Sequence, residues 1–303
     1  MTGTTLTSVA AGTRSPASPT ANRARRRILM PPPIVAVFIV VLVVVVVSAA
    51  LAPLVAPHDP TRNDLIARLQ PPAWLEGGST EHLLGTDQLG RDVLTRLIYG
   101  ARVSLIIAVL GTLFGAVLGV TCGLAAGLVR GRLDELMMFL VDAWLALPFL
   151  VIALVLVALL GTSLPVLVLL AALSGWAGFT RISRGLGLQI REEQYVLAAR
   201  AIGVSQVRLL IRHSLPNVIA PLIVLTTTEL TGIILLEASL SYLGFGIQPP
   251  LAAWGLMVNE GREYLNTSWW LGVFPGALIM LVAISVSLVG DWLRDVLDPT
   301  TRT

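Results

Sequence analysis

Three acidic side chains interrupt the long apolar stretches of this sequence: Asp142, Glu229 and Glu237. A carboxylate inside a bilayer is costly and usually faces a cavity, a transport path or a polar partner. Such groups could bind a cationic part of a solute or carry a proton. They could equally form hydrogen bonds between helices, and the threonines at 226–228 and 231 are nearby partners for Glu229. Both interpretations stay open, so the three residues are candidates for lining a translocation path.

The other reactive residue types give little indication of catalysis. The histidines His58, His82 and His213 stand far apart, and Cys122 is the sole cysteine. This spacing contains no CxxC motif and no pair of metal ligands, so we predict no metal site. Ser174 precedes a glycine in an apolar stretch, but no histidine lies in such a stretch to activate it. We therefore expect that the chain is not an enzyme.

A polar, arginine-rich island extends from about residue 181 to residue 216, between two apolar stretches. Residues 191–201 favour helix, with Glu192 and Glu193 in its first turn, and Gly203 suits the left-handed residue that ends a helix. Ser205 can cap a second helix over residues 206–214. Small side chains here let another protein approach closely, while apolar and basic ones can hold it. The candidate docking residues are Tyr195, Leu197, Ala198, Ala199, Arg200, Ala201, Ile202, Gly203, Arg208, Leu215 and Pro216.

Composition places most of the chain in a membrane. Hydrophobic residues make up 55% of its 303 residues and charged ones 13%, roughly half the charged share of a soluble domain. Six stretches approach the length of about 20 apolar residues that a membrane-spanning helix needs. They are Pro33–Pro53, Val103–Val129, Leu136–Leu160, Pro165–Phe179, Val218–Leu240 and Leu271–Val289. The predicted fold class is therefore all-α, a polytopic membrane protein with six transmembrane helices.

Arginine distribution sets the expected orientation of these helices. All 21 basic residues are arginine, and a cytoplasmic N-terminus puts 15 of them inside and six outside. We therefore predict that both termini are cytoplasmic, with residues 1–30 as a disordered tail and 31–303 as one transmembrane domain. The segments at about 54–102 and 241–270 then lie outside. The first stretch could instead be a signal peptide that ends at Ala50–Ala52, although its length and late start favour a retained helix.

Two features concern helix packing and the outer surface. Gly111, Gly115 and Gly119 recur every four residues, a pattern that permits close contact with another helix, which we expect within the chain. Residues 85–102 begin Gly-Thr-Asp-Gln-Leu-Gly-Arg-Asp and predict a helix at the outer membrane surface. Thr86 or Asp87 can cap this helix, and Asp92 can pair with Arg96 four residues later.

The island resembles the EAA loop of permease subunits in ATP-binding-cassette importers. Ala198, Ala199, Gly203 and Leu215–Pro216 fall at the spacing of that loop, whereas Leu197 replaces its acidic residue and His213 a hydrophobic one. Three further segments resemble the second, C-type permease of peptide/nickel importers, and the resemblance runs from about His58 to Pro299. These segments are Gly85–Arg102, Glu237–Gly255 and Gly290–Pro299.

This resemblance implies a type I importer permease in the cell membrane that moves di- or oligopeptides by alternating access. Nickel or another solute is the alternative cargo. In such a system ATP and Mg²⁺ bind to two separate ATPase subunits, which dock on the island as a coupling helix, so this chain holds no cofactor. The other implied partners are a homologous second permease, an extracytoplasmic substrate-binding protein and membrane lipid, with no nucleic acid. Asp87, Arg91, Asp92 and Trp254 are candidates for contact with that binding protein.

A proton-coupled secondary transporter that uses the three carboxylates is the competing function. It predicts inverted repeats, which are not obvious between the two halves of the sequence, and it gives the island no role. The island itself could also be an amphipathic helix that lipid headgroups hold at the membrane surface.

Overall fold

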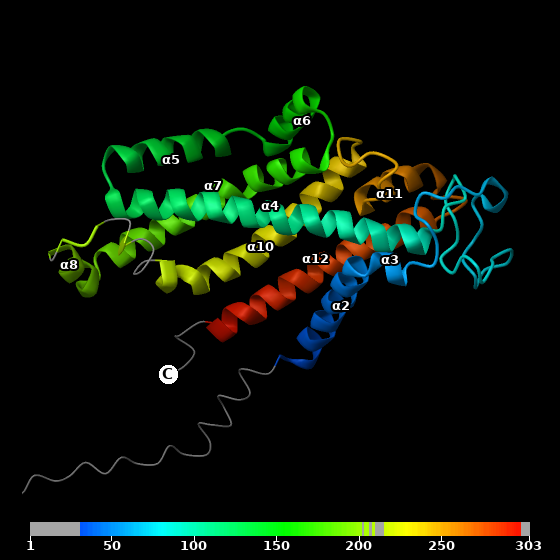
Figure 1. Cartoon of the computed structure of the whole chain (residues 1–303), viewed down its shortest axis with the longest axis horizontal. Coiled ribbons are helices and arrows are strands. Elements are labelled where there is room, and N and C mark those ends of the chain that lie inside the picture. Colours follow the sequence, from blue (N-terminus) through cyan, green and yellow to red (C-terminus); the bar gives the residue numbers. More distant parts are fainter. Residues whose placement is uncertain (1–30, 202, 206–207, 210–214, 298–303) are drawn as a thin grey trace, which may run out of the picture.

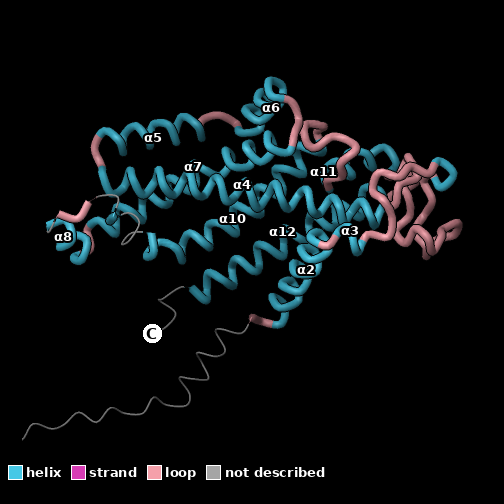
Figure 2. The backbone as a smooth tube through the Cα atoms, viewed as in Figure 1, coloured by secondary structure: helices cyan, strands magenta, loops and turns pink. Residues whose placement is uncertain are grey.

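The computed structural model describes residues 31–201, 203–205, 208–209 and 215–297. These residues form helices joined by loops, and no β-strand occurs among them. The helices make an elongated bundle (Figure 1), and most of the loops gather at the end that carries α11 (Trp254–Gly261; Figure 2). The opposite end carries α8 (Gln194–Ala201). This architecture confirms the predicted all-α class.

Five of the described helices are long and apolar enough to cross a membrane. A sixth candidate span consists of α5 (Arg132–Leu145) and α6 (Phe149–Leu160), which meet at a bend of 86° and return the chain from the α8 end (Figure 1). Short helices α3 (Ala52–Val55), η1 (Leu65–Ala67) and η3 (Arg262–Tyr264) lie between the long ones. The five long helices are α2 (Pro33–Ala50), α4 (Val93–Val129), α7 (Leu164–Arg191), α10 (Leu215–Tyr242) and α12 (Trp270–Leu297).

Four of the predicted span boundaries are wrong. The stretch expected to end at Val289 continues to Leu297 in α12, and the other three boundaries differ for local reasons. The stretch Leu136–Leu160 is broken before Pro148, because proline disfavours the helical conformation in the residue that precedes it. The stretch expected to end at Phe179 continues to Arg191, since arginines beyond that point find acidic partners on α5. The stretch expected from Val103 begins at Val93, so the predicted surface helix is the first part of α4.

The bundle is organised around α4 and α7, which share its most extensive helix–helix contact. Gly111 of α4 faces Ala171 of α7, and Gly115 faces Ala172. Farther along, Gly127 lies against the backbone of α7 beside Gly187. Because no bulky side chain intervenes, the two backbones approach closely, as the glycine spacing predicted within the chain.

Two apolar clusters fill the rest of the interior. The larger one joins α4, α7, α10, α11 and α12 and contains the fully buried Ile107, Leu170, Ile233 and Trp254. The smaller one lies toward the α8 end, where Leu124, Phe179 and Val218 meet. Helix α2 packs against α12 and α4 but leaves many valines exposed, as expected for a surface that meets lipid or another subunit.

The α4–α7 seam makes a direct prediction about stability. A β-carbon added at Gly115 would lie 2.7 Å from the carbonyl oxygen of Ala172, so Gly115→Val must push the helices apart at a cost of about 1–3 kcal/mol or more. We expect a lower midpoint of thermal unfolding for the purified variant, followed by tryptophan fluorescence. Gly276→Ala on α12 is the control, since no atom lies within 4 Å of a β-carbon there. Equal midpoints for both variants would contradict the close packing of α4 against α7 at Gly115.

Candidate functional sites

The arginine-rich island begins at a turn that is tied to the end of α4. Arg191 is the last residue of α7, and its Nη1 donates to the carbonyl oxygen of Leu128 at 2.9 Å. Arg130 pairs with Glu192 at 3.2 Å across the same turn. The last carbonyl groups of a helix carry partial negative charge, so an arginine is well placed there. The turn between α7 and α8 is thereby fixed to the neighbouring helix.

The first helix of the island is shorter than predicted. It begins at Gln194, and Glu192 caps the end of α7 instead of lying in the first turn of α8. The carbonyl oxygen of Glu193 accepts the backbone N–H groups of Val196 and Leu197 and so starts the helix. The first part of the predicted island, up to Arg191, belongs to α7. A continuous helix therefore connects the interior of the bundle to the turn before α8.

Helix α8 turns one apolar side chain inward and two outward. Val196 is fully buried in the smaller apolar cluster, beside Leu209. Tyr195 and Leu197 are 43% and 50% exposed, and Ala198 is exposed as well. Partial burial of the phenol and the nearby Glu193 carboxylate raise the pKa of Tyr195, which keeps it neutral near pH 7. Among the described side chains of this helix, those of Tyr195, Leu197 and Ala198 thus present a partly apolar surface away from the bundle.

The structure describes some of the remaining docking candidates and not others. Gly203 has φ of +81°, the left-handed conformation predicted for it. The Ser205 hydroxyl accepts the Arg208 N–H at 3.4 Å, consistent with the predicted cap, and Ala201, Arg208 and Leu215 are exposed. Ile202 and most of the predicted helix over 206–214 lie outside the described residues, as do the side chains of Ala199, Arg200 and Pro216.

Glu237 connects two helices inside the bundle. Glu237 is only 4% exposed. Oε2 accepts the Ser104 hydroxyl of α4 at 2.9 Å, and Oε1 accepts the Ser241 hydroxyl of α10 at 2.7 Å. Both oxygens are used within the chain, which is the interhelical alternative considered for this residue.

Asp142 also has a partner in the chain. Its Oδ1 accepts Nη2 of Arg181 at 2.6 Å, which joins α5 to α7. Both side chains are exposed, so the pair contributes at most about 1 kcal/mol in water. A second pair between the same helices, Arg184 with Asp134, is bidentate and more buried. These contacts explain how α7 carries several arginines beyond the predicted span.

Glu229 differs from the other two acidic residues, because it makes no hydrogen bond or ion pair with any described residue. It lies half-buried on α10 with its carboxylate against two glycines of α7. A β-carbon added at Gly178 would lie 2.8 Å from Oε1, and one at Gly175 would lie 3.1 Å from Oε2. The glycines leave room for this carboxylate between the helices. Of the three path candidates, Glu229 alone retains both oxygens for another partner.

A cavity of about 550 Å³ lies nearer the α8 end, between α7, α10 and α12. Ile182, Val224, Thr228 and Arg294 are among its lining residues. A smaller neighbouring cavity shares Val224, Thr228 and Arg294. Sequence reasoning missed this site, although Thr228 precedes a path candidate and Arg294 belongs to the Gly290–Pro299 motif.

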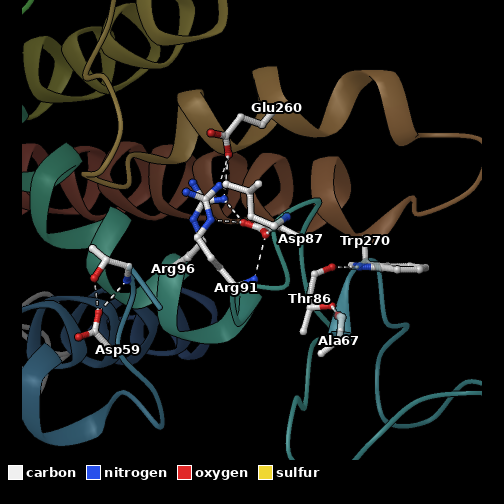
Figure 3. A network of polar contacts seen from close by, with 10 residues as sticks. Asp59, Ala67, Thr86, Asp87, Arg91, Arg96, Glu260 and Trp270 are labelled. Atoms are coloured by element: carbon white, nitrogen blue, oxygen red, sulfur yellow. Dashed lines mark hydrogen bonds and ion pairs between the residues drawn. The ribbon is translucent and has the colours of Figure 1, made fainter. Parts of the chain in front are cut away.

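At the opposite end of the bundle, Asp87 is the centre of a buried ion-pair network (Figure 3). Its Oδ2 accepts Nε of Arg91 at 2.7 Å and Nη1 of Arg96 at 2.5 Å, while Oδ1 accepts the backbone N–H groups of Leu89 and Arg91. Glu260 of α11 accepts Arg96 at 2.8 Å. Two arginines therefore meet two carboxylates, and the network fastens the loop before α4 to α11.

Two predicted contacts in this region are wrong. Arg96 pairs with Asp87 and Glu260 and not with Asp92, because Asp92 caps α4 by accepting the Thr95 N–H at 2.8 Å. Thr86 does not cap a helix either: its hydroxyl accepts the Gln70 N–H at 2.8 Å and donates to the Ala67 carbonyl, and its own carbonyl accepts Trp270 Nε1 (Figure 3). These long-range partners could not be read from spacing along the chain.

Comparison with known proteins identifies the family. The family described as "Binding-protein-dependent transport system inner membrane component" matches residues 119–303. A second family, the N-terminal TM domain of oligopeptide transport permease C, matches residues 21–72. The chain belongs to these transport permeases. It is a multi-pass membrane protein, in agreement with its helices.

Curated relatives and a solved structure agree with this assignment. The permease is 41% identical over 254 residues to the di/tripeptide transport system permease protein DppC of Pseudomonas aeruginosa, with 84% of each chain covered. It is 44% identical over 254 residues to the dipeptide transport system permease protein DppC of Escherichia coli, covering 84% of this chain and 85% of that one. A chain of the inward-facing MetNI methionine ABC transporter shares its fold at a TM-score of 0.55 and 17% identity, over 68% of the permease and 97% of that chain.

The four candidates for receptor contact are buried within the permease. Asp87, Arg91 and Asp92 hold together the loops at the α11 end of the bundle, and Trp254 donates from Nε1 to the Leu97 carbonyl at 3.0 Å. Contact between these four side chains and a binding protein stays a prediction. Other apolar side chains of this end are exposed, among them Leu65, Trp74 and Ile66, the last of them 99% exposed.

The ion-pair network predicts a large effect from one substitution. Asp87→Ala leaves Arg91 and Arg96 buried with Glu260 as their remaining acidic partner. Breaking such a buried pair costs about 3–5 kcal/mol, because an uncompensated charge is left behind. We expect the purified permease to unfold at a clearly lower temperature. Glu76→Ala, at an exposed position of the same outer segment, should leave the midpoint unchanged, and a similar midpoint for Asp87→Ala would disprove the role of the network.

Proposed function

We propose that the permease is one of two membrane subunits of an ATP-driven importer of di- or oligopeptides. The cargo is supported by relatives that are named as dipeptide and di/tripeptide permeases. Two ATPase subunits that bind ATP and Mg²⁺, a second permease and an extracytoplasmic substrate-binding protein complete the proposed assembly. The family to which the chain belongs supports these proposed partners.

The arrangement of α8 is the observation that supports this proposal most directly. Val196 fixes the helix in a cluster that includes Leu124 of α4, Phe179 of α7 and Val218 of α10. Tyr195, Leu197 and Ala198 meanwhile face away from the bundle. A partner that binds this exposed face of α8 can therefore displace the helix. The buried Val196 then transmits the displacement to α4, α7 and α10. This is the mechanical contact that a coupling helix needs.

Alternating access then follows from the way the helices are connected. The ATPase subunits approach each other when they bind ATP and carry α8 with them. Helix α7 runs without a break from the turn before α8 to Leu164, so its motion reaches the interior of the bundle. The cavity between α7, α10 and α12 opens or closes as these helices shift. ATP hydrolysis by the partners resets the cycle, and this chain performs no chemistry itself.

Glu229 gives the proposed path a chemical preference. Its carboxylate is half-buried and unpaired among the described residues, one residue after Thr228 of the cavity wall. A peptide carries an ammonium group at its amino end. A charge-assisted hydrogen bond between the two is stronger away from bulk water than in it. We infer that Glu229 contacts the amino end of the peptide during passage.

The coupling role of the island can be tested at Gly203. Its φ of +81° is strained for a β-branched residue, whereas asparagine tolerates it, and no atom of the described residues lies within 4 Å of an added β-carbon. Gly203→Val should therefore act through the backbone, at a cost of about 1–3 kcal/mol. In the assembled importer we expect basal ATP hydrolysis to persist while peptide uptake falls several-fold. Gly203→Asn should transport normally.

A crosslink separates docking from a local folding defect in this experiment. The chain has a single cysteine, Cys122, so Cys122→Ala with Ala198→Cys places one thiol on the exposed face of α8. It should crosslink to an ATPase subunit, and Ile66→Cys in the same background should not. Normal uptake by Gly203→Val, or crosslinks from Ala198→Cys to lipid alone, would refute the proposed docking.

The path role of Glu229 predicts a charge-dependent change in uptake. Glu229→Gln keeps the shape but loses the charge, and a hydrogen bond to a charged group contributes about 1.5–3 kcal/mol, or roughly ten- to a hundredfold in affinity. We expect a lower uptake of free peptides by about that factor and little change for peptides acetylated at the amino end. Glu237→Gln is the matched control, because an amide can still bond both Ser104 and Ser241. Equal losses for both peptide types would exclude this contact.

A further inference from the structure

Folding brings together three side chains that lie far apart in the sequence: His58, His82 and Asp92. Their ligand atoms all lie within 4.8 Å of one another. Nδ1 of His82 is 3.0 Å from Oδ1 of Asp92, and Nδ1 of His58 is 3.8 Å from Oδ2 of the same carboxylate. The two imidazole rings have centroids 4.9 Å apart. The histidines are thus not isolated in space, although their spacing in the sequence led us to expect no metal site.

The imidazole ring of His58 has one nitrogen atom without a hydrogen-bond partner in the described part of the chain. Its Nδ1 is buried and has no hydrogen-bond partner among the described residues. A buried nitrogen without a partner is unfavourable and uncommon in folded proteins. The backbone N–H of His58 donates to the Thr95 hydroxyl at 3.2 Å, and the Thr95 N–H donates to Asp92 Oδ2 at 2.8 Å. These bonds place the backbone of His58 close to the Asp92 carboxylate, and they leave Nδ1 of His58 in need of a partner.

We propose that His58, His82 and Asp92 bind one divalent transition-metal ion of the Zn²⁺ type. The ligands are Nδ1 of each imidazole and one carboxylate oxygen, with water in the fourth position. Two imidazoles and a carboxylate suit Zn²⁺ better than Mg²⁺ or Ca²⁺, which prefer oxygen ligands. Bonds of about 2.0–2.1 Å in a tetrahedral site put neighbouring ligand atoms about 3.3 Å apart. Nδ1 of His82 lies 3.0 Å from Oδ1 of Asp92, close to that value, and the three ligand atoms all lie within 4.8 Å of one another.

The surroundings of the three ligands favour a cation. They border a cavity of about 20 Å³, which is enough for one small ion or water molecule. The same cavity is lined by Asp59, Asp64 and Glu81, with Arg62 as the one opposing charge among its lining residues. The negative charges exceed the positive one even before Asp92 is counted. A cation therefore gains from the field of the cavity as well as from its ligands.

Protonation at the site is consistent with a neutral-histidine metal centre. Without an ion, a proton on Nδ1 of His82 can donate to Asp92 at 3.0 Å. With an ion, both imidazoles carry their proton on Nε2 and direct the Nδ1 lone pair to the metal, as zinc sites require. Oδ2 of Asp92 keeps its bond to the Thr95 N–H, and Oδ1 is the oxygen available to the ion. The cap of α4 thus survives metal binding.

The ion would clamp the outer segments of the permease. His58 follows α3, the end of the first pass, whereas Asp92 immediately precedes α4. His82 belongs to the long loop between them. A shared ligand sphere ties all three to the N-terminus of α4, next to the network of Asp87. The site lies among the outer loops and not beside Glu229, so the ion is a resident structural group and not cargo.

Metal content of the full-length chain provides the test. The permease is purified with its affinity tag removed, stripped with EDTA, equilibrated with buffered Zn²⁺, desalted and measured by elemental mass spectrometry. We expect close to one zinc per chain, with zinc–nitrogen distances of about 2.0–2.1 Å by X-ray absorption. His58→Ala and His82→Ala should each lose most of the zinc. Asp92→Asn keeps the helix cap, since asparagine caps as well as aspartate, but should weaken zinc binding at least tenfold.

Two further measurements guard against misfolding and against surface binding. Glu81→Gln, on the wall of the same cavity, should retain one zinc. His58→Gln keeps a polar side chain of similar size, and without zinc it should unfold at the temperature of the unaltered permease. Added zinc should raise the unfolding midpoint of the unaltered permease and not that of His58→Gln, because an ion that binds only the folded state stabilises it. Less than a fifth of an equivalent of zinc on the unaltered chain, equal zinc on His58→Gln, or retention of Ca²⁺ or Mg²⁺ in its place would overturn the proposal.

Discussion

The close approach of α4 and α7 is the constraint on which the other helix positions depend. Glycines of α4 face alanines, backbone groups and a glycine of α7 over most of their shared length. Protein interiors tolerate little excess volume, so this seam leaves α7 one position relative to α4. Helix α10 packs against both, α8 continues from α7, and Glu229 lies in the space left by Gly175 and Gly178. The island and the path candidate therefore share one structural support.

The outer end is held by charge more than by apolar packing. Residues 56–92 contain few regular elements, and several of their large apolar side chains, such as Ile66 and Trp74, stay exposed. Asp87, Arg91, Arg96 and Glu260 compensate by forming a neutral, nearly dry network around the start of α4. This explains why polar residues that looked suited to a partner are buried instead. It also explains how His58 and His82 meet Asp92, since the same loops converge on the first turn of α4.

Local properties could be predicted from the sequence, and properties that depend on distant partners could not. The apolar lengths of α2 and α10, the left-handed Gly203 and the glycine face of α4 follow from hydropathy, backbone conformation and residue size. Hydropathy does not detect bends, so the break before Pro148 was missed. The full length of α7 depends on Asp134 and Asp142 of α5, and the partner of Arg96 depends on α11. The histidine cluster needs the folded loop, which no periodicity encodes.

The docking surface and the cavity are connected directly by helices, without a further structural element between them. Helices α7 and α10 are the ones that enter and leave the island, and both also line the cavity of about 550 Å³. Pro221 lies inside α10 at the cavity wall, where the missing backbone hydrogen bond makes a helix easier to bend. A displacement of the island therefore acts first on the cavity walls, while the seam with α4 holds the far part of α7 in place. Bending of α10 at Pro221 is the change that we expect to open and close the path.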